Sequence, residues 1–361
     1  RRAYIITSAI VGILVISNII MFIYIYIKYD REYRVDKDIK YYRELPGDYS
    51  PAEMSALYNF GSINSRDVTA TLMDLVRRGY LKLETVNIEK RGFFGRGSKE
   101  DYVFIKLKEP DEELSAHEEY LFKWLIESVG NGISMKLEDL DKYTKSTSGA
   151  RKFQEKYSVW KDMVKQEAGD RGFFDENIVR GKLLGGLFAV VEIVASIYIV
   201  HLGNYVGVIT LILGIVFLIY SFAFNRRSPY GAQQYNLWKA FRRFLLDFSN
   251  IKEYTPPSIV IWEHYLVYAI SLGVAKEVIK QLKVVISPEE FYNPSLTYLY
   301  TSNMSRQFMM MDRIDNVTTS FEKTINTAIS RSATSSTTGT GGGFSGGGGG
   351  GGGSGGGGGA F

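Results

Sequence analysis

Few residues in this sequence could carry chemistry. The chain has 361 residues with three histidines and no cysteine, which excludes disulfides, thiol nucleophiles and cysteine-containing metal sites. The histidines (His117, His201 and His264) are far apart in sequence, so we expect no metal site. Glu263 and His264 are an adjacent acid and base, but neighbouring positions of a helix point about 100° apart. We therefore predict no catalytic residues, no cofactor and no enzymatic activity.

Glu192 is the one ionisable residue with an unusual setting, because it lies inside a long apolar segment, 183–200. A carboxylate at the centre of a bilayer costs about 3 kcal/mol, so such a group is a functional candidate. One interpretation is a packing contact, to Ser196, Thr210, Ser221 or a second copy of the chain. The other is a proton path in an oligomeric transporter or channel. The other apolar segments contain no acid, histidine or lysine, which favours packing.

Three apolar segments are long enough to position Glu192 in a membrane: 3–27, 183–200 and 205–224. At about 1.5 Å per residue each of them can cross most or all of a hydrocarbon core of about 30 Å. Only residues 201–204 separate the second segment from the third, which predicts a tight helical hairpin. We therefore expect a mainly α membrane protein with three transmembrane helices, one (1–27) plus a hairpin (183–224).

Basic residues flank these segments on one side, and they predict the orientation of the chain. They are Lys28, Arg31, Arg34, Lys37, Lys40, Arg43, Arg180, Lys182, Arg226 and Arg227. The hairpin turn has no lysine or arginine. We therefore expect 28–182 and 225–361 in the cytoplasm, with the hairpin turn outside.

The net charge of +4 comes from the C-terminal part of the chain. Residues 28–182 hold 28 basic and 29 acidic residues, whereas residues 225–361 hold 13 basic and 9 acidic. Basic residues beside a membrane can gain about 1 kcal/mol each from anionic lipid. A role as topology signals alone accounts for Arg226 and Arg227. A surface-lying amphipathic helix over about 231–248 would present Lys239, Arg242 and Arg243 to the lipid. The candidate lipid-facing residues are Arg226, Arg227, Lys239, Arg242 and Arg243.

The loop 28–182 has the order of a winged helix. Ser50 and Glu53 form a capping box around Pro51, which starts a helix ending near Gly61. Ser65 caps a second helix, which ends at Gly79. Alternating strands at 80–83 and 102–107 then flank a Gly-rich tip, 91–97. These elements predict an α+β winged-helix-like domain.

Contact with DNA would use the second helix and the wing, through Arg66, Thr71, Arg77, Phe93 and Phe94. The same helix face carries Asp67 and Asp74, and the net charge of the loop is −1. Affinity for duplex DNA depends mainly on neutralising phosphates. We therefore expect a structural or protein-binding winged helix and do not expect nucleic acid as a partner. The two phenylalanines could touch the bilayer or pack on their own domain.

The glycine excess describes one segment of the chain. Of the 37 glycines, 17 lie between 339 and 359. A sequence of this kind cannot bury enough surface to fold. We expect a disordered Ser/Thr/Gly-rich tail over 330–361, preceded by a cytoplasmic helical region over 225–329. Within that region, 258–274 is apolar but contains Glu263 and His264, which favours a buried soluble helix over a fourth span.

The order of these features resembles the bacterial predicted membrane proteins defined by domain of unknown function 2207 (YciQ-like proteins). The resemblance is carried by 42–46, 50–53, 69–80, the double apolar segment, 262–274 and the closing Gly-Gly-Gly-Phe-Ser-Gly tract. It implies an exported β-rich domain and a signal peptide upstream, and location in the bacterial cell membrane. It implies no chemistry.

The function expected from the sequence is that of a membrane-anchored scaffold or interaction protein. It would link the exported domain to a cytoplasmic platform and would bind the lipid bilayer, protein partners or a second copy of itself. Two alternatives are a membrane-bound winged-helix transcription regulator and an oligomeric transporter or channel subunit centred on Glu192.

Overall fold

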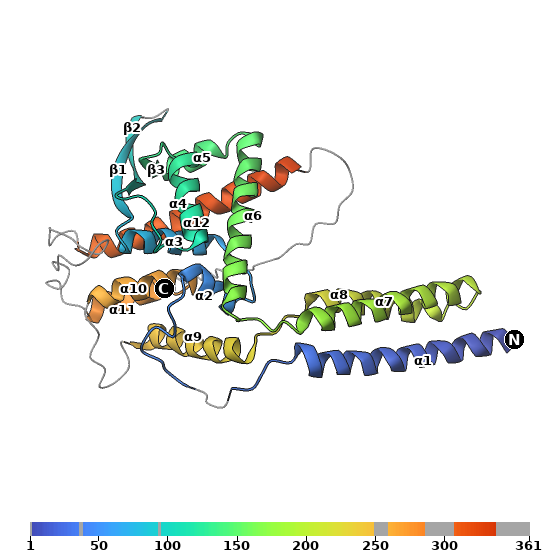
Figure 1. Cartoon of the computed structure of the whole chain (residues 1–361). Coiled ribbons are helices and arrows are strands. Elements are labelled where there is room, and N and C mark those ends of the chain that lie inside the picture. The colour runs from blue at the N-terminus through green and yellow to red at the C-terminus, as the bar shows by residue number, and fades with distance from the viewer. Residues whose placement is uncertain (1, 36–38, 93–94, 249–258, 286–306, 337–361) are drawn as a thin grey trace, which may run out of the picture.

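The protein is mainly helical, with one small antiparallel sheet (Figure 1). The computed structural model describes residues 2–35, 39–92, 95–248, 259–285 and 307–336. Three long helices project together from a compact body that contains the other elements. We call the three helices the apolar bundle and the body the polar domain.

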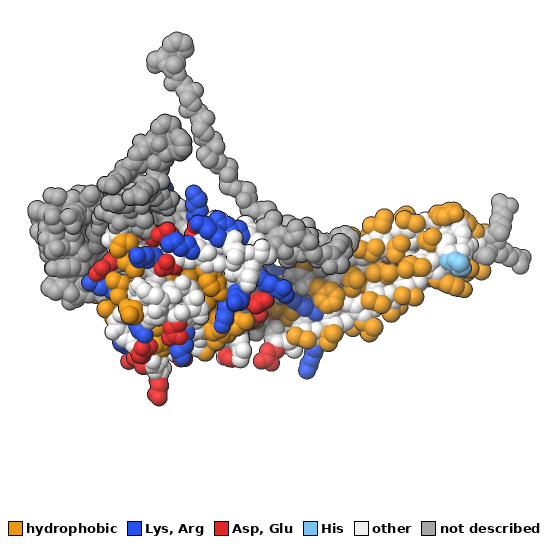
Figure 2. Space-filling model, turned by 90° about the horizontal axis from the view of Figure 1, so that it is seen from above, with side chains coloured by type: hydrophobic (Ala, Val, Ile, Leu, Met, Phe, Trp, Pro, Cys, Tyr) orange, Lys and Arg blue, Asp and Glu red, His pale blue; other side chains and the backbone are white. Residues whose placement is uncertain are grey.

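The apolar bundle consists of α1 (Arg2–Ile25), α7 (Ile178–His201) and α8 (Gly207–Ala223), with a π-helical turn, η1 (Tyr26–Asp30), after α1. Its outward side chains are almost all apolar, whereas charged side chains gather on the polar domain (Figure 2). Two helical stretches, Tyr4–Asp30 and Ile178–His201, are long and apolar enough to cross a membrane. Helix α8 is equally apolar but has 17 residues, a length of about 26 Å.

Small residues let the two helices of the hairpin approach closely. A Cβ added to Gly185 would lie 2.5 Å from the Ser221 hydroxyl, and one added to Gly214 would lie 2.9 Å from Ile193. Helix α1 packs along both α7 and α8 (Figure 1). The predicted hairpin is therefore present.

The polar domain begins as the sequence predicts. The capping box of Ser50 and Glu53 starts α2 (Pro51–Tyr58), and α3 (Ser65–Arg77) follows, although its cap is Asn64 and not Ser65. Strands β1 (Leu81–Gly92) and β2 (Gly95–Lys106) pair antiparallel from Leu81↔Lys106 to Gly92↔Gly95. The third strand, β3 (Ser134–Lys136), pairs with β2. Phe93 and Phe94, at the predicted wing tip, lie outside the described residues.

Helices from both halves of the chain complete the polar domain. The remaining elements of the first half are α4 (Ala116–Lys123), the π-helical η2 (Trp124–Val129), α5 (Leu137–Tyr143) and α6 (Thr147–Asp170). Those of the second half are α9 (Pro229–Asp247), α10 (Ile259–Ser271), α11 (Ala275–Val285) and α12 (Gln307–Ser336).

The two polar segments predicted as separate regions, 28–182 and 225–329, share one hydrophobic core. It runs from Tyr49 to Ala328 and includes Trp160, Trp238 and Trp262, all fully buried. Helix α10 is a buried helix of this core, as its Glu and His indicated, and not part of the apolar bundle.

The start of the Ser/Thr/Gly-rich tail differs from the prediction. Helix α12 continues to Ser336, so 330–336 is helical, and residues 337–361 lie outside the described part of the chain. Val317, Phe321, Ile325 and Ala328 form one buried stripe of α12. This stripe packs against α3, α5 and α6, and burial of it outweighs the weak helix propensity of the Ser/Thr-rich end.

Candidate functional site

Glu192 has a partner that the sequence reasoning missed. Asn18 of α1 donates a hydrogen bond from Nδ2 to Glu192 Oε2, at 2.6 Å. Both residues are buried between the helices of the apolar bundle, and Glu192 is only 1% exposed. Asn18 is one of four polar residues in 3–27, and an amide in an apolar segment is a signal that could have identified it. The contact fits the packing interpretation.

The predicted contacts of the Glu192 carboxylate to Ser196, Thr210 and Ser221 do not form. The Ser196 hydroxyl lies 2.7 Å from both the backbone carbonyl of Glu192 and Thr210 Oγ1. Ser221 donates to the carbonyl of Phe217 in its own helix. Each hydroxyl therefore satisfies a backbone carbonyl, as serine commonly does inside a helix.

Two further polar contacts hold α1 against the hairpin, one at each end of the bundle. At the hairpin turn, Asn204 donates to Thr7 at 2.8 Å and to Ser8 at 3.0 Å. At the end near the polar domain, the Tyr220 hydroxyl donates to Asp30 at 2.9 Å. Polar groups thus fix the continuous segment of α1 and η1 near both of its ends and at Asn18, which defines its register.

Arg226 lies in the connection between α8 and α9 and joins the bundle to the polar domain. Its guanidinium donates to the Asp175 carboxylate and, at 2.7 Å, to the carbonyl of Lys28. The Tyr33 ring covers the guanidinium, and the Tyr33 hydroxyl donates to Asp175 at 2.9 Å. Burial would raise the pKa of Asp175, but hydrogen bonds from the Asn177 amide, Tyr33 and Arg226 hold that pKa below its usual value.

Arg227 points to the other side and closes the end of α2. Its Nε donates to the carbonyl of Leu57 at 2.9 Å, and Nη2 donates to the carbonyl of Tyr58 at 2.8 Å. These are the last carbonyls of α2, where a cation compensates the helix dipole. Nη1 contacts Glu32 at 3.1 Å. We call the contacts of Arg226 and Arg227 the junction.

The side chains of the junction correct the lipid-facing role suggested for these arginines. Arg226 is 5% exposed and Arg227 is 3% exposed, with Arg227 between the rings of Phe60 and Tyr235. Buried guanidinium groups are kept where carboxylates and carbonyls satisfy them. The sequence pattern of basic residues beside an apolar segment does not distinguish these inward-facing arginines from outward-facing ones.

The remaining basic candidates lie on α9, which packs one face into the hydrophobic core of the polar domain. Its buried face carries Trp238, Phe241 and Phe244. Of the three candidates, Lys239 alone is exposed. Arg242 is half-buried and donates to the carbonyl of Leu272 at 3.4 Å, and Arg243, also half-buried, donates to that of Ile39 at 3.0 Å.

The helix predicted to contact DNA, α3, is enclosed by protein. It packs against α2, α10 and α12, and all its residues from Asp67 to Val76 are buried. Thr71 is fully buried and its hydroxyl donates to the carbonyl of Asp67 at 2.8 Å. Arg66 is half-buried with its guanidinium against Gly273, and Arg77 contacts Asp74 at 2.7 Å. The polar face of α3 is therefore not a free surface, because α10 covers it.

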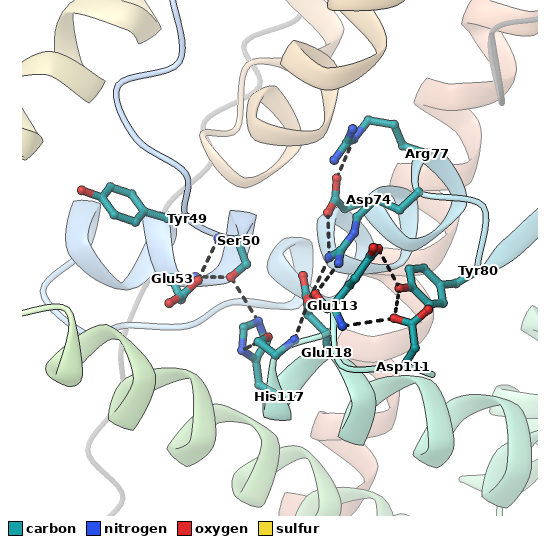
Figure 3. A network of polar contacts seen from close by, with 12 residues as sticks. Tyr49, Ser50, Glu53, Asp74, Arg77, Tyr80, Asp111, Glu113, His117 and Glu118 are labelled. Carbon is teal, nitrogen blue, oxygen red and sulfur yellow. Dashed lines mark hydrogen bonds and ion pairs between the residues drawn. The ribbon is translucent and has the colours of Figure 1, made fainter. Parts of the chain in front are cut away.

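A buried polar network joins α2, α4 and α6, and Figure 3 shows its members Ser50, Glu53 and His117. His117 is fully buried, and its Nδ1 lies 2.7 Å from Glu167 Oε2. With the ring proton there, Nε2 accepts from the Ser50 hydroxyl at 3.1 Å. Burial would raise the pKa of Glu167, but its hydrogen bonds with His117 hold that pKa below the usual value.

The order Ser50–His117–Glu167 is that of a hydrolase triad, and the sequence reasoning found no such set. The same Ser50 oxygen also accepts the backbone N–H of Glu53 at 3.1 Å, as the cap of α2. Glu167 also accepts the backbone N–H of His117 at 2.9 Å. All these atoms therefore serve to orient three chain segments against one another.

Two titratable groups on either side of the α3–α10 interface are perturbed. Asp67 is fully buried at the start of α3, and burial raises its pKa to about 6. His264 of α10 is half-buried, and burial together with Arg77 lowers its pKa to about 4. No group of three or more His, Asp or Glu residues that could hold a metal occurs among the described residues.

The fold and its surface define a mainly helical protein with two helices long and apolar enough to cross a bilayer. Its family is established by sequence. The chain belongs to the predicted membrane proteins with domain of unknown function 2207, whose C-terminal domain matches residues 38–282. The match confirms the resemblance seen in the sequence. No curated protein and no solved structure matches the chain.

Proposed function

We propose that the chain is a membrane-anchored scaffold that holds a cytoplasmic protein-binding platform in a fixed position relative to the bilayer. The junction carries this proposal. A flexible tether would suffice to keep a domain near a membrane, whereas here two buried arginines bind backbone and carboxylate groups of both parts. A buried cation of this kind is costly unless its geometry is maintained, so the junction favours a defined orientation.

The proposed scaffold is multi-pass, with α1, α7 and α8 as three spans. Contacts of α1 with both helices of the hairpin, near its ends and its middle, support one three-helix unit. The polar domain is cytoplasmic in this proposal, because basic residues flank its side of the bundle. The exported domain implied by the resemblance would lie on the opposite side, and the chain would connect the two.

The structure gives less support to the two alternatives. A transcription regulator would need an accessible recognition helix, whereas α3 is covered by α10 and α12. A transporter centred on Glu192 would need a path to that carboxyl, whereas Asn18 binds it inside a packed bundle. We propose that the protein is not an enzyme and that the triad-like network is structural.

Photo-crosslinking in cells tests the scaffold proposal with the complete protein in its own membrane. A photoreactive phenylalanine analogue would replace Leu107, Ile133 or Val159, exposed apolar residues of the polar domain. Val191, exposed on α7, is the matched position on the apolar bundle. We expect discrete protein adducts from one or more of the three positions and lipid adducts from Val191. Absence of protein adducts above the unirradiated control at all three positions would count against a scaffold.

A further inference from the structure

A cleft of about 460 Å³ opens between the segment that follows η1 and the first half of α9. One part of its lining is polar and comes from Arg34, Gln233 and Asn236. The other part is apolar and comes from Val35, Ile39 and Leu237. Ligand pockets of this size commonly combine an apolar wall with a few polar groups that fix orientation.

The position of the cleft is set by the ends of the apolar bundle. Arg34 follows closely after Asp30, the last residue of η1, and α9 starts at Pro229, shortly after α8 ends. Both walls therefore leave the bundle at the same end and meet beside it. If the bundle spans a bilayer, this is the depth of the lipid headgroups.

Acidic side chains near the cleft accept hydrogen bonds from other residues of the chain. Three of them accept hydrogen bonds from inward-facing partners: Asp30 from Tyr220, Glu32 from Arg227, and Asp175 from Arg226. Among the described residues at this level, the exposed cationic side chains are Lys28, Arg31, Arg34 and Arg180, against the exposed acids Glu32, which is paired with Arg227, and Glu176. The field around the cleft entrance therefore favours an anion.

Arg34 is the cation that the fold leaves available in this cleft. Its side chain is exposed, and it forms no hydrogen bond or ion pair with any residue in the part of the chain that the structure describes. Arg226 and Arg227, in contrast, are buried and donate to carbonyls and carboxylates of the junction. A guanidinium offers two parallel donors that match the oxygens of a phosphate.

We propose that this cleft binds the headgroup of an anionic phospholipid. Arg34 contacts the phosphate, and the amide of Gln233 lies on the α9 side to bind a headgroup oxygen. Val35, Ile39 and Leu237 contact the glycerol and the first carbons of the acyl chains. The apolar half of the lining favours a lipid over free phosphate, because free phosphate would leave these apolar side chains in contact with water. This site differs from the α9 arginines that the sequence suggested. It rests on the proposed membrane position of the apolar bundle and not on the scaffold role.

Native mass spectrometry of the whole chain in a neutral detergent tests the site. Phosphatidylglycerol or phosphatidylcholine is added to the wild type and to three variants. Arg34→Gln removes the cation of the cleft, and Gln233→Leu removes an amide without changing charge. Arg31→Gln is the matched control, because Arg31 is an exposed arginine outside the lining.

We expect the wild type to prefer phosphatidylglycerol. We also expect Arg34→Gln to weaken that binding about fivefold, as loss of one basic residue near lipid does, and Gln233→Leu to weaken it about two- to threefold. Arg31→Gln should change it less than twofold. Equal losses for Arg34→Gln and Arg31→Gln would show diffuse surface attraction and overturn the site. So would equal binding of the two lipids, or displacement of the lipid by glycerol phosphate at a similar concentration.

Discussion

Asn18 of α1 and Glu192 of α7 are joined by a hydrogen bond of 2.6 Å between residues 174 positions apart in sequence. The contact pairs the amide of the first apolar helix with the single ionisable residue in the apolar stretch of the second. Serine and threonine side chains near Glu192 bind backbone carbonyls or one another instead. A polar pair inside an apolar bundle specifies which helices meet and in which register.

The first prediction concerns the role of Glu192. Glu192→Gln keeps an oxygen that can accept from Asn18, so we expect stability within about 0.5 kcal/mol of the wild type. Glu192→Leu leaves the Asn18 amide without its acceptor and should cost about 1 kcal/mol. Denaturant titration of the purified chain in mixed micelles measures both. A Gln variant as damaged as the Leu variant would show that the carboxyl group itself is required.

The second prediction concerns Arg227. Arg227→Met leaves the carbonyls of Leu57 and Tyr58 and the carboxylate of Glu32 without their donor, and we expect a loss of about 3 kcal/mol. Arg227→Lys should recover only part of it, because one ammonium cannot reach all three groups. Lys239→Met, an exposed position, should change stability by less than about 0.5 kcal/mol. Thermal unfolding followed by circular dichroism checks the series, and equal effects at 227 and 239 would contradict the junction.

The third prediction concerns pH. Because burial raises the pKa of Asp67 from 3.8 to about 6, the folded state binds more protons than the unfolded state between those values. The free energy of unfolding contributed by this group therefore falls as pH rises from about 4 to 6, by up to about 3 kcal/mol. Asp67→Asn removes the effect and still offers an oxygen to the Asn64 amide.

The Asp67 measurement compares the variant with the wild type at pH 4.5 and pH 7. The free energy of unfolding of Asp67→Asn, relative to that of the wild type, should be higher at pH 7 than at pH 4.5. A difference that is the same at both pH values would refute the raised pKa of Asp67. His264 acts in the opposite sense, because its lowered pKa of about 4 makes stability rise with pH between about 4 and 6.5. His264→Gln should therefore weaken the loss of stability in acid.

The fourth prediction concerns Ser50. We expect no covalent labelling by a fluorophosphonate probe, because the Ser50 oxygen is held as the cap of α2 by the Glu53 amide and its base, His117, is fully buried. Ser50→Ala should cost about 1 kcal/mol through loss of the helix cap. His117→Ala should cost about 2–3 kcal/mol, since Ser50 and Glu167 lose a buried partner. Labelling of the wild type that disappears in Ser50→Ala would indicate a nucleophilic serine and contradict the structural role.

The fifth prediction concerns orientation, and it uses the absence of cysteine from the chain. Tyr205→Cys places a thiol at the hairpin turn, where Tyr205 is 77% exposed. Lys239→Cys places one on the polar domain, where Lys239 is exposed. In intact spheroplasts, a membrane-impermeant maleimide should label the first variant and label the second only after lysis. The reverse pattern would overturn the proposed orientation.

Local signals gave much of the secondary structure. Ser50, Pro51 and Glu53 start α2 as predicted, because capping depends on residues only three positions apart. The apolar length of 183–200 and 205–224 predicted the hairpin for a similar reason. Helix α5 was not predicted, since it is short and polar and is stabilised mainly by contacts with distant elements. Helices α11 and α12 were covered only by the predicted helical region 225–329, which gave no bounds for either of them.

The candidate sites were predicted less well than the elements that hold them. Three residues that were assigned to surfaces are buried: Arg226, Arg227 and Thr71. The prediction was wrong because the sequence does not show which distant residue a charged or hydroxyl side chain will contact. Asn18 was missed although it lies in an apolar segment. The ligands of these groups are backbone carbonyls and side chains from other elements, which no spacing rule identifies.

The sequence by itself determined the membrane-protein family, the apolar helices, the caps of α2 and the absence of cysteine chemistry. These follow from composition and from interactions over a few residues. Only the tertiary structure decided that segments on both sides of the hairpin share one core and that α3 is an inner helix. It also decided that Arg226 and Arg227 bind groups of both the apolar bundle and the polar domain. Those outcomes depend on which surfaces bury one another, and burial is a property of the assembled chain.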